Sequence, residues 1–503
     1  MYNLLTFDVG TTSMKTALFS EKFEVLDIFS REYDLLTPGE GRVELDPDIY
    51  WKALRSAINA ILSKGTDNKS IRVITITTQG ETIIPVDARG NTIGNAIVWI
   101  DNRAVAEAGF LNRIFTRDEF YKMTGMPDIT PAMPIAKLLW IKNNLPELYE
   151  RTHKFLLIED YLIFKLTGEL VSEQSLLSST GYLDINTGGY WRKILEAAGI
   201  GMEKLPQIMP CAVKAGTILK TVAAETGLDC STVVSTGAMD QISSAVGAGN
   251  ITPGIITETT GTALVAAVTV KKPDFGNSSK VPIYRHFNHN YIYLPYCPTS
   301  GIILKWFKDE FLEPLINESV QNKTSYNKMS YKRADELAEQ VNAGSDGLVM
   351  LPDFAGKLCP DYNPYAKGIF YGIGLNHKKG HFIRAILEGV SYMLKENIEF
   401  LESLGIEVNE IRSLGGGSNS RLWSQIKADV LNKTVLTMRN AETTSLGTAI
   451  MGALSMGLYG TAEEICEKYI GIKESFQPNE QNKSIYENGY RIYTTVYNRL
   501  KYI

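Results

Sequence analysis

Alternating and continuous apolar stretches near the start of the chain predict β-strands. These stretches cover residues 2–7, 15–19, 24–31, 71–77 and 82–87. Short runs that are rich in β-branched and aromatic residues and bounded by glycine or polar residues are typical of strands. Apolar residues at helical spacing then predict helices over residues 49–64, 132–144 and 159–166. Strands that give way to helices indicate an α/β fold, with a mixed sheet and helices outside it.

The same alternation returns in the second half of the chain. Strands are predicted over residues 254–257 and 263–270, and helices over residues 382–404, 422–431 and 445–457. Between the halves lies a cluster of glycines that ends in Thr252-Pro253-Gly254, and such breakers mark turns and linkers. A chain of 503 residues also exceeds what one hydrophobic core usually serves. We therefore predict two domains, residues 1–249 and 250–503.

Composition narrows the class of protein. Hydrophobic residues make up 44% of the chain and charged residues 21%, as in ordinary globular proteins with large cores. The 51 Lys and Arg against 56 Asp and Glu give a net charge of −5, which argues against nucleic acid or an anionic membrane as principal partner. No apolar run approaches the roughly 20 residues that span a bilayer, and the N-terminus lacks the pattern of a secretion signal. The five cysteines show no CxxC spacing, so we expect no zinc site, no disulfide scaffold and a cytoplasmic location.

Two glycine-centred turns between strand-like segments are the strongest functional signal. The first hairpin carries Gly10-Thr11-Thr12-Ser13, with Asp8 before it and Lys15 after it, and the second carries Thr260-Gly261-Thr262. Glycine allows a positive φ, and neighbouring N–H and hydroxyl groups can then point at one anion. Either hairpin alone is better explained as a tight turn without a ligand. Together, at the head of two similar halves, they predict a duplicated fold that holds a polyphosphate.

An acidic residue follows a predicted strand at the end of the first half. The segment Gly237-Ala238-Met239-Asp240-Gln241 forms a glycine-bearing turn that opens a helix, with Asp240 in its first turn. Asp240 could be only a helix cap or a surface acid, because helix starts favour acids. A carboxylate at a strand end could instead accept the proton of a hydroxyl that attacks phosphorus.

Two further segments have the chemistry of a binding site. Leu414-Gly415-Gly416-Gly417-Ser418-Asn419 precedes a helix, so its backbone could approach a flat ring or a phosphate, although such a run can also be a plain loop. Gln79-Gly80-Glu81 and Trp99 each follow a strand-like stretch. Polar groups and one indole suit a small polyhydroxylated ligand, and the alternative for Trp99 is a core aromatic.

Several familiar motifs are missing from the sequence. There is no GxxxxGK[ST] loop, so a Walker P-loop is excluded as the ATP cradle. There is also no GxSxG nucleophile turn. The five histidines share no ligand spacing and indicate packing or surface positions rather than a metal site.

The order of these segments resembles the FGGY carbohydrate kinases, which are grouped with actin, hexokinase and the Hsp70 ATPase domain. The resemblance extends from Asp8 to about Gly460. It rests on residues 8–13, 79–81, 97–103, 137–140, 237–240, 260–262, 364–372, 384–389, 415–418, 422–429 and 446–449. It implies an α/β protein of two actin-like (ribonuclease H-like) ATPase domains with an interdomain cleft.

The resemblance also implies roles for individual residues. Asp240 would be the catalytic base, and Asp8 and Asp240 would hold Mg²⁺ through water molecules, because this ion loses its water shell reluctantly. Residues expected to bind ATP are Gly10, Thr11, Thr12, Ser13, Lys15, Thr260, Gly261, Thr262, Gly416, Gly417 and Asn419. Residues expected to bind the sugar are Gln79, Gly80, Glu81, Trp99, Asp240 and Gln241.

The turn at residues 79–81 bears on the substrate. Glycerol kinases have Arg where this chain has Gly80, and xylulokinases usually show Gln-Met-His-Gly there, whereas erythritol, ribitol and L-xylulose kinases look similar in having Gln-Gly and a charged residue. Loss of the arginine leaves room for a ligand larger than a triol. We therefore predict a kinase for a pentose-sized ketose or polyol, xylulose-like first, with a glycerol or erythritol/ribitol-type kinase as the alternative.

A function of a different class stays open at this point. The chain could be a conformational ATPase of the actin/Hsp70 kind or a catalytically silent sugar sensor, but neither would need Gln79, Glu81 and Trp99. We expect a small sugar or polyol as the partner, no nucleic acid or membrane, and a homodimer as one alternative for the oligomeric state.

Overall fold

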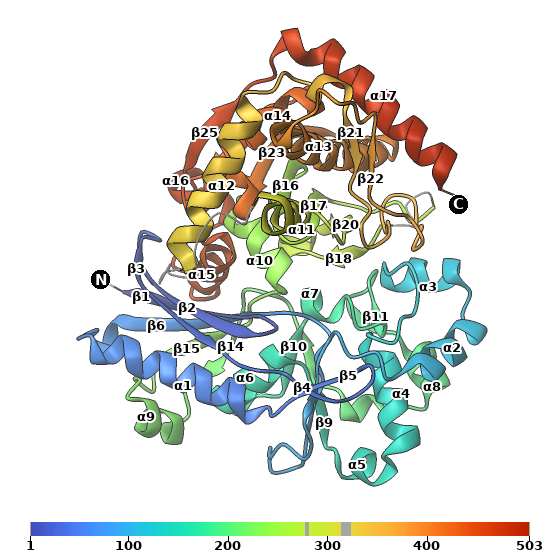
Figure 1. Cartoon of the computed structure of the whole chain (residues 1–503). Helices are drawn as coiled ribbons and strands as arrows, with labels where there is room; N and C mark the ends of the chain where they lie inside the picture. Colours follow the sequence, from blue (N-terminus) through green and yellow to red (C-terminus); the bar gives the residue numbers. More distant parts are fainter. Residues whose placement is uncertain (1, 277–280, 313–322, 502–503) are drawn as a thin grey trace. The chain divides into compact units, whose positions relative to one another are not determined.

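The computed structural model describes residues 2–276, 281–312 and 323–501 and divides into two compact units (Figure 1). The first unit comprises residues 1–251, 271–292 and 442–470, and the second comprises residues 252–270, 293–441 and 471–503. The boundary predicted after residue 249 lies beside the first change of unit, but two later segments return to the first unit. Within the described residues, no helix is both long and apolar enough to cross a membrane.

A six-stranded sheet forms the centre of the first unit, in the order β14-β15-β6-β1-β2-β3. Its strands are β1 (Asn3–Val9), β2 (Ser13–Ser20), β3 (Val25–Glu32), β6 (Ile71–Thr78), β14 (Lys214–Thr217) and β15 (Val233–Ser235). β1 pairs antiparallel with β2 and parallel with β6, and β6 pairs parallel with β15. The carboxyl ends of β1, β6 and β15 therefore meet at one edge of the sheet.

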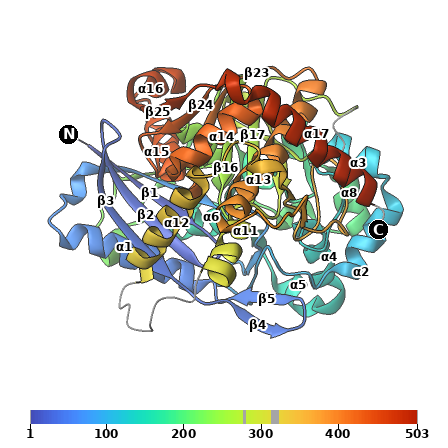
Figure 2. The same ribbon diagram turned by 45° about the horizontal axis from the view of Figure 1, so that its top comes forward.

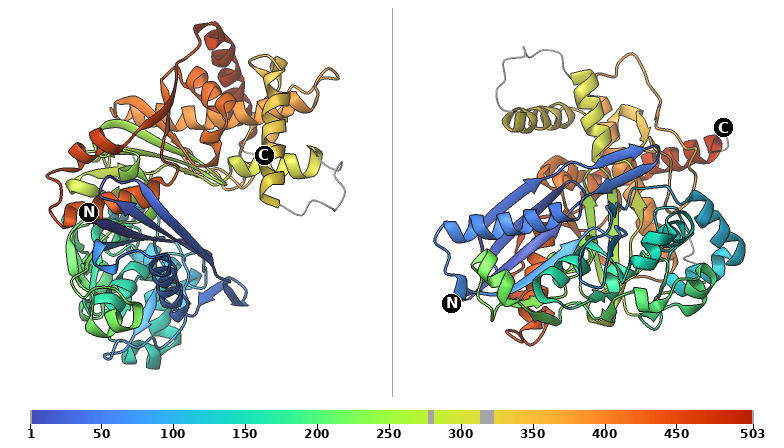
Figure 3. Two further views of the ribbon diagram at one scale, coloured as in Figure 1. Left: turned by 90° about the vertical axis from the view of Figure 1, so that its left-hand side faces the viewer. Right: turned by 90° about the horizontal axis from the view of Figure 1, so that it is seen from below.

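Helices cover both faces of this sheet. On one face lie α1 (Asp48–Ser63), α6 (Ile158–Thr167) and α9 (Lys220–Thr226), and on the other lie α10 (Asp240–Gly247), α15 (Thr443–Ser455) and α16 (Ala462–Tyr469). The other helices of the unit are α2 (Val105–Ile114), α3 (Arg117–Thr124), α4 (Pro134–Asn144), α5 (Pro146–Arg151), α7 (Gln174–Leu177) and α8 (Arg192–Ala198). Figure 3 shows α1 running alongside the long strands. Short strands complete the unit: β4 (Leu36–Gly39), β5 (Arg42–Leu45), β7 (Ile84–Val86), β8 (Ala96–Ile97), β9 (Lys154–Leu156), β10 (Val171–Glu173), β11 (Leu183–Asp184), β12 (Gly189–Tyr190), β13 (Gln207–Met209) and β18 (Ile283–Arg285).

Alternation along β1 explains why both faces are covered. Leu5, Phe7 and Val9 join a buried cluster with α1 and α6 on one face, and Leu4 joins a second cluster with α10, α15 and α16 on the other. Successive side chains of a strand point to opposite faces, so a strand that is apolar at almost every position is buried on both.

The helices α10 and α15 approach each other through two glycines. A Cβ on Gly247 would overlap the carbonyl oxygen of Thr443, and a Cβ on Gly447 would overlap that of Ser243. Both helices belong to the first unit, although they are far apart in the chain. The hydroxyl groups of Ser244 and Thr443 lie 3.2 Å from each other, and these residues are 199 positions apart in the sequence. This contact brings residues 442–470 back onto the first sheet.

The second unit repeats the central strands of the first. β16 (Gly254–Thr260) pairs antiparallel with β17 (Leu264–Val270) and parallel with β23 (Val408–Leu414), as β1 pairs with β2 and β6. Its other strands are β20 (Tyr296–Cys297), β21 (Val349–Leu351), β22 (Ile369–Tyr371), β24 (Val435–Met438) and β25 (Ile472–Phe476). Its helices are α11 (Gly301–Phe307), α12 (Lys323–Glu339), α13 (Lys379–Ser403), α14 (Arg421–Leu431) and α17 (Lys483–Leu500), of which α13, α14 and α17 lie together (Figure 2). The predicted duplication of an α/β fold is confirmed.

Candidate active site

Three segments with predicted roles converge at the edge of the first sheet where parallel strands end. Val9 of β1 lies opposite Thr78 of β6, and Thr78 is bridged to Met239. The backbone N–H of Gln79 also donates to the carbonyl oxygen of Val9 at 3.1 Å. The residues that follow these strand ends, including the first hairpin, Gln79 and Asp240, therefore share one edge, as expected for a ligand site in an open α/β sheet.

Asp240 and Asp8 interact electrostatically at this edge. Asp240 is the first residue of α10, and its Oδ1 accepts the N–H of Gln241 at 2.6 Å. Burial raises the pKa of Asp240 to about 7, with the negative charges of Asp8 and Glu81 adding to the rise. Burial also raises the pKa of Asp8 to about 6, an effect that Lys15 opposes and Glu442 increases. Met239, rather than Asp240, occupies the helix cap, so capping does not account for this carboxylate.

Lys15 reaches Asp8 from the neighbouring strand. The two residues are paired across β1 and β2, and the Nζ atom of Lys15 donates to Oε2 of Glu442 at 2.7 Å. Glu442 directly precedes α15 in the first unit. The predicted phosphate-binding lysine is thus held in an ion pair whose side chains are about a third exposed (39% and 28%).

The first hairpin is tight, but its glycine is not in the expected conformation. The N–H of Gly10 donates to the carbonyl oxygen of Ser13 at 2.9 Å. Neither Gly10 nor Gly261 has a positive φ, so that expectation was wrong. A Cβ on Gly10 would lie 3.3 Å from Ser13 O, whereas one on Gly261 would meet nothing within 4 Å. Close packing accounts for the first glycine, whereas the packing around Gly261 leaves room for a larger side chain.

Hydrogen bonds join the first hairpin to two predicted sugar-binding residues. The indole Nε1 of Trp99 donates to Oγ1 of Thr11 at 2.9 Å, and this hydroxyl donates to Oε1 of Gln79 at 3.3 Å. Trp99 is 37% exposed, so it is not a core aromatic. The arrangement presents an indole and an amide beside a hydroxyl of the predicted phosphate turn.

Glu81 and Gly80 lie in a constrained turn. Glu81 has a φ of 68°, which is unusual for a residue other than glycine and often marks functional sites. A Cβ on Gly80 would lie 2.9 Å from Oγ of Ser179, so a larger residue would need this neighbour to move. Burial raises the pKa of Tyr284 in β18, and the charges of Glu81 and Asp240 add to that rise, so Tyr284 lies near this turn. No sequence motif points to Tyr284.

Buried acids hold the backbone that leads into Asp240. Oε1 of Glu159 accepts the N–H of Gly237 at 2.7 Å, and Oγ of Ser175 accepts the N–H of Met239 at 3.0 Å. Burial raises the pKa of Glu159 well above its usual value and that of Glu173, which accepts from the Ser175 hydroxyl, to about 7. These supporting residues lack a sequence motif, because only the fold brings residues 159 and 173–175 next to residues 237–239.

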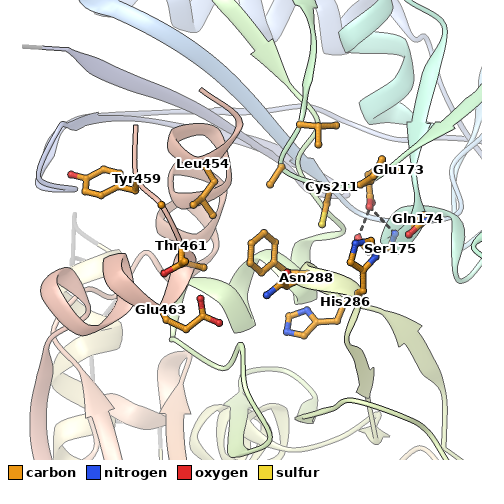
Figure 4. Close-up of a pocket in the computed structure, with 17 residues that line it drawn as sticks. Glu173, Gln174, Ser175, Cys211, His286, Asn288, Leu454, Tyr459, Thr461 and Glu463 are labelled. Carbon is orange, nitrogen blue, oxygen red and sulfur yellow. Dashed lines mark hydrogen bonds between the residues drawn. The ribbon is translucent and has the colours of Figure 1, made fainter. Parts of the chain in front are cut away.

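A cavity of about 390 Å³ lies behind this support in the first unit. Figure 4 shows Glu173, Ser175 and His286 on one side of it and Leu454 and Tyr459 on the other. None of the predicted site residues lines it. Ser175 connects this cavity to the predicted catalytic segment, because it lines the cavity and its hydroxyl accepts the N–H of Met239.

The predicted nucleotide residues of the second unit line one pocket of about 630 Å³. This hairpin pocket is lined by Thr260, Gly261, Thr262, Gly301, Ile302, Leu304, Lys305, Tyr331, Lys332, Asp335, Gly416, Gly417, Asn419, Ser420 and Trp423. Its volume lies in the usual range for small-molecule sites, about 300–1,000 Å³. The lining residues from α11 and α12 were not predicted, although the Ser-Gly start of α11 resembles the other turns.

The glycine run and the second hairpin are in close contact. Gly415 has a φ of 74°, and a Cβ there would lie 2.9 Å from the carbonyl oxygen of Thr260. A Cβ on Gly417 would lie 2.7 Å from the Thr260 methyl carbon. The N–H of Gly301 donates to the carbonyl oxygen of Gly261 at 2.8 Å. Glycine is therefore needed at 415 and 417 so that the two walls of the hairpin pocket can meet.

A buried ion pair supports the second hairpin from below. Lys427 and Glu258 are both fully buried, and Nζ of Lys427 donates to Oε1 of Glu258 at 2.5 Å and to Oγ1 of Thr260 at 3.0 Å. Ser413 completes the network with a hydrogen bond to Glu258. Breaking one side of such a pair would leave a buried charge without a partner, at a cost of about 3–5 kcal/mol.

Comparisons with known proteins agree with this arrangement. The model of the N-terminal domain of the FGGY family of carbohydrate kinases matches residues 3–247, and that of the C-terminal domain matches residues 257–456. A gluconokinase of Bacillus licheniformis is 30% identical over 96% of this chain and 93% of its own length. A xylulose kinase of Staphylococcus xylosus is 27% identical over 99% of this chain and its entire length (100%). A ligand-bound xylulose kinase from Lactobacillus acidophilus superposes with a TM-score of 0.90 at 25% identity, covering 99% of this chain and 98% of the other.

Proposed function

This chain belongs to the FGGY family of carbohydrate kinases, and on that premise we propose that it transfers the γ-phosphoryl group of ATP to a hydroxyl of a pentose-sized ketose or polyol, with xylulose as the first substrate to test. It is an ATP:sugar phosphotransferase. The observation that carries the choice of site is the shared strand edge of the first unit, where Asp240 lies beside the Trp99–Thr11–Gln79 network.

In the proposed reaction Asp240 acts as the general base. The sugar hydroxyl oxygen forms a bond to the γ-phosphorus, the bond from that phosphorus to the β–γ bridging oxygen breaks, and ADP leaves. The proton of the hydroxyl passes to the carboxylate of Asp240. A pKa near 7 suits this role, because a base works best when its pKa is close to the working pH.

Gln79, Glu81, Trp99 and Gln241 would bind and orient the sugar, with Gly80 leaving room for it. The first hairpin and Lys15 would contact the transferred phosphoryl group. Thr260, Gly261, Thr262, Gly416, Gly417 and Asn419 would bind the rest of the nucleotide in the hairpin pocket.

Asp8 and Asp240 fit a Mg²⁺ site. Burial raises the pKa of both carboxyl groups, and the charge of Asp8 adds to the rise at Asp240. A divalent cation bound between them would favour the ionised form of both. Mg²⁺ typically takes one or two carboxylates and completes its shell with water and phosphate oxygens, and the described residues contain no group of three or more His, Cys, Asp or Glu placed for a metal. The ion would neutralise charge on the phosphates of ATP.

Gluconate is the second candidate substrate, because a gluconokinase is 30% identical to this chain. Its carboxylate would approach Asp240, whose pKa already reflects the charges of Asp8 and Glu81. A neutral sugar avoids this repulsion, so we rank the ketose or polyol first. Reaction in the cytoplasm is proposed too, since all five cysteines are free thiols and ATP is the donor.

The test is a substrate panel assayed for ADP release with ATP and Mg²⁺. We expect phosphorylation of xylulose or a related pentitol, and weaker or no turnover of glycerol, erythritol and gluconate. Turnover of gluconate alone would make the second candidate correct. ATP hydrolysis that no sugar, polyol or aldonate accelerates would instead favour a conformational ATPase.

A further inference from the structure

Lys137 is a fully buried lysine whose amine is surrounded by backbone carbonyl groups. It lies on α4 in the first unit and is 0% exposed. Its Nζ atom donates to the carbonyl oxygens of Val98 at 2.9 Å, Glu81 at 3.2 Å and Trp99 at 3.4 Å. A protonated amine has three N–H donors, and here each donor has one carbonyl group to bind.

The three carbonyl groups belong to two separate segments that carry the proposed sugar-binding side chains. One segment contains Glu81 with its positive φ, and the other contains Trp99. Further bonds connect the same segments: the N–H of Trp99 donates to Oγ1 of Thr82 at 3.1 Å, and Ile83 and Ile97 exchange backbone hydrogen bonds of 2.9–3.1 Å. The amine of Lys137 adds a third connection, at the residue whose backbone is strained.

Burying this amine is costly by itself. Burial lowers the pKa of Lys137 to about 8; Glu81 and Asp101 oppose the fall and Arg103 adds to it. An apolar side chain would fill the same space without that cost. The benefit of burying a charge here is that the carbonyl groups of Glu81 and Trp99 are held in fixed positions.

We propose that Lys137 is a positioning residue that holds the segments of Glu81 and Trp99 together as one sugar-binding wall, and so sets the affinity for the sugar without touching it. The inference rests on the proposed function only in naming the ligand as a sugar. The contacts of Lys137 point to the backbone of both segments, not to the reacting atoms.

Loss of the proton would weaken this connection. A neutral amine has two donors and one lone pair, so one of the three carbonyl groups would face a lone pair instead of an N–H. The charged groups that affect this amine are Glu81, Asp101 and Arg103. We therefore expect the KM for the sugar to rise as the pH increases through about 8, while the KM for ATP stays nearly constant.

The experiment compares Lys137→Met with Lys427→Met in the full-length protein. Lys427 is a matched control because it is also fully buried and supports a proposed ligand-binding turn, but in the second unit. With xylulose, or with gluconate if only the acid is phosphorylated, Lys137→Met should raise the KM for the sugar about tenfold or more and remove its rise above pH 8. Lys427→Met should mainly raise the KM for ATP.

Hydrogen exchange gives a readout that needs no substrate. In Lys137→Met the amides of residues 79–83 and 97–99 should exchange at least tenfold faster than in the wild type, with exchange in the second unit unchanged. A folded Lys137→Met protein with wild-type exchange there and a wild-type KM for the sugar would overturn the proposal. If the variant does not fold, a wild-type KM for the sugar that is constant between pH 7 and 9 overturns it.

The two hypotheses can fail separately. A wild-type protein that phosphorylates none of the panel, yet shows faster exchange at residues 79–83 in Lys137→Met, would contradict the proposed function and support the role of Lys137. Phosphorylation of a sugar of the panel, together with an unchanged KM for that sugar in Lys137→Met, would support the proposed function and contradict the role of Lys137.

Discussion

Lys15 and Glu442 form an ion pair at 2.7 Å although 427 positions separate them in the chain. The pair lies next to Asp8, whose pKa Lys15 lowers and Glu442 raises. The two partners therefore have opposite effects on the acid proposed to bind Mg²⁺.

The first prediction follows from these opposite effects. Glu442→Gln should move the acidic limb of the pH–rate profile to lower pH, because it removes a negative charge near Asp8. Lys15→Met should move the limb to higher pH and reduce kcat roughly tenfold to 100-fold, since a positive charge near the phosphates is lost. The pH dependence of kcat measures both shifts. Displacement of the acidic limb in the same direction by both variants would contradict this account. The pair is partly exposed, so its loss should cost less than about 1 kcal/mol of stability.

The second prediction concerns Asp240. Asp240→Asn should reduce kcat about 100-fold or more, as expected for loss of a general base. Wild-type turnover should fall as the pH drops through about 7, because the base must be ionised to accept a proton. The measured value will belong to the coupled Asp8 and Asp240 pair rather than to one residue. Near-native turnover in Asp240→Asn would show that another group is the base.

Asp240 also has a predictable effect on stability. A carboxyl group whose pKa is higher in the folded than in the unfolded state destabilises the fold increasingly as the pH rises from about 4 to 7. Asp240→Asn and Asp8→Asn should therefore raise the thermal unfolding midpoint at pH 8 in the absence of Mg²⁺, and raise it less at pH 5. Calorimetry at the two pH values is the measurement. Equal changes at both pH values would mean that burial does not raise the pKa of these carboxyl groups.

The third prediction concerns the hairpin pocket. Gly261→Val should raise the KM for ATP more than the KM for the sugar, because a side chain there would point into open space in this pocket. For the same reason it should leave the unfolding midpoint nearly unchanged. Gly301→Ala is the matched contrast: its Cβ would overlap the carbonyl oxygen of Gly261, so it should also lower stability. An unchanged KM for ATP in Gly261→Val would place the nucleotide elsewhere.

The fourth prediction concerns the contact between α10 and α15. Gly447→Ala should destabilise the first unit by about 1–3 kcal/mol or more, because the added methyl group would overlap the carbonyl oxygen of Ser243. Gly109→Ala is the control: this glycine lies inside α2 with only the end of Arg113 at 4.0 Å, so alanine should stabilise the helix by up to about 1 kcal/mol. Chemical denaturation measures both. A tolerated Gly447→Ala would mean that the helices can separate without cost.

Local sequence patterns predicted the elements that form the central strands and several long helices. β1 and β6 begin or end within one or two residues of the predicted ranges, and α13 and α14 do so at one end or both. Alternation and helical spacing are local properties, so they can be recognised in a single sequence. The small helices α2, α3, α8 and α9 were not predicted.

The site was predictable where a turn follows a strand and unpredictable where support comes from elsewhere in the fold. Gly10, Gln79 and Asp240 each follow a strand, so sheet topology brings them together. Lys137 and Glu159 face these turns from helices. Lys137 belongs to the segment 137–140 that carries part of the family resemblance, but nothing in the local sequence of either residue indicates which turn it supports. The residue-by-residue roles stay predictions until the variants are measured.

The return of α15 and α16 to the first sheet has a consequence for how the chain is made. During synthesis the N-terminal strands leave the ribosome long before residues 446–465, which belong to the cluster that covers one face of those strands. The face that carries apolar residues such as Leu4 and Phe19 therefore stays uncovered until nearly the whole polypeptide has been made. At roughly 5–20 residues per second the delay is of the order of 20 to 90 seconds. A nascent chain that stops before α15 would expose this face and be a natural client for chaperones.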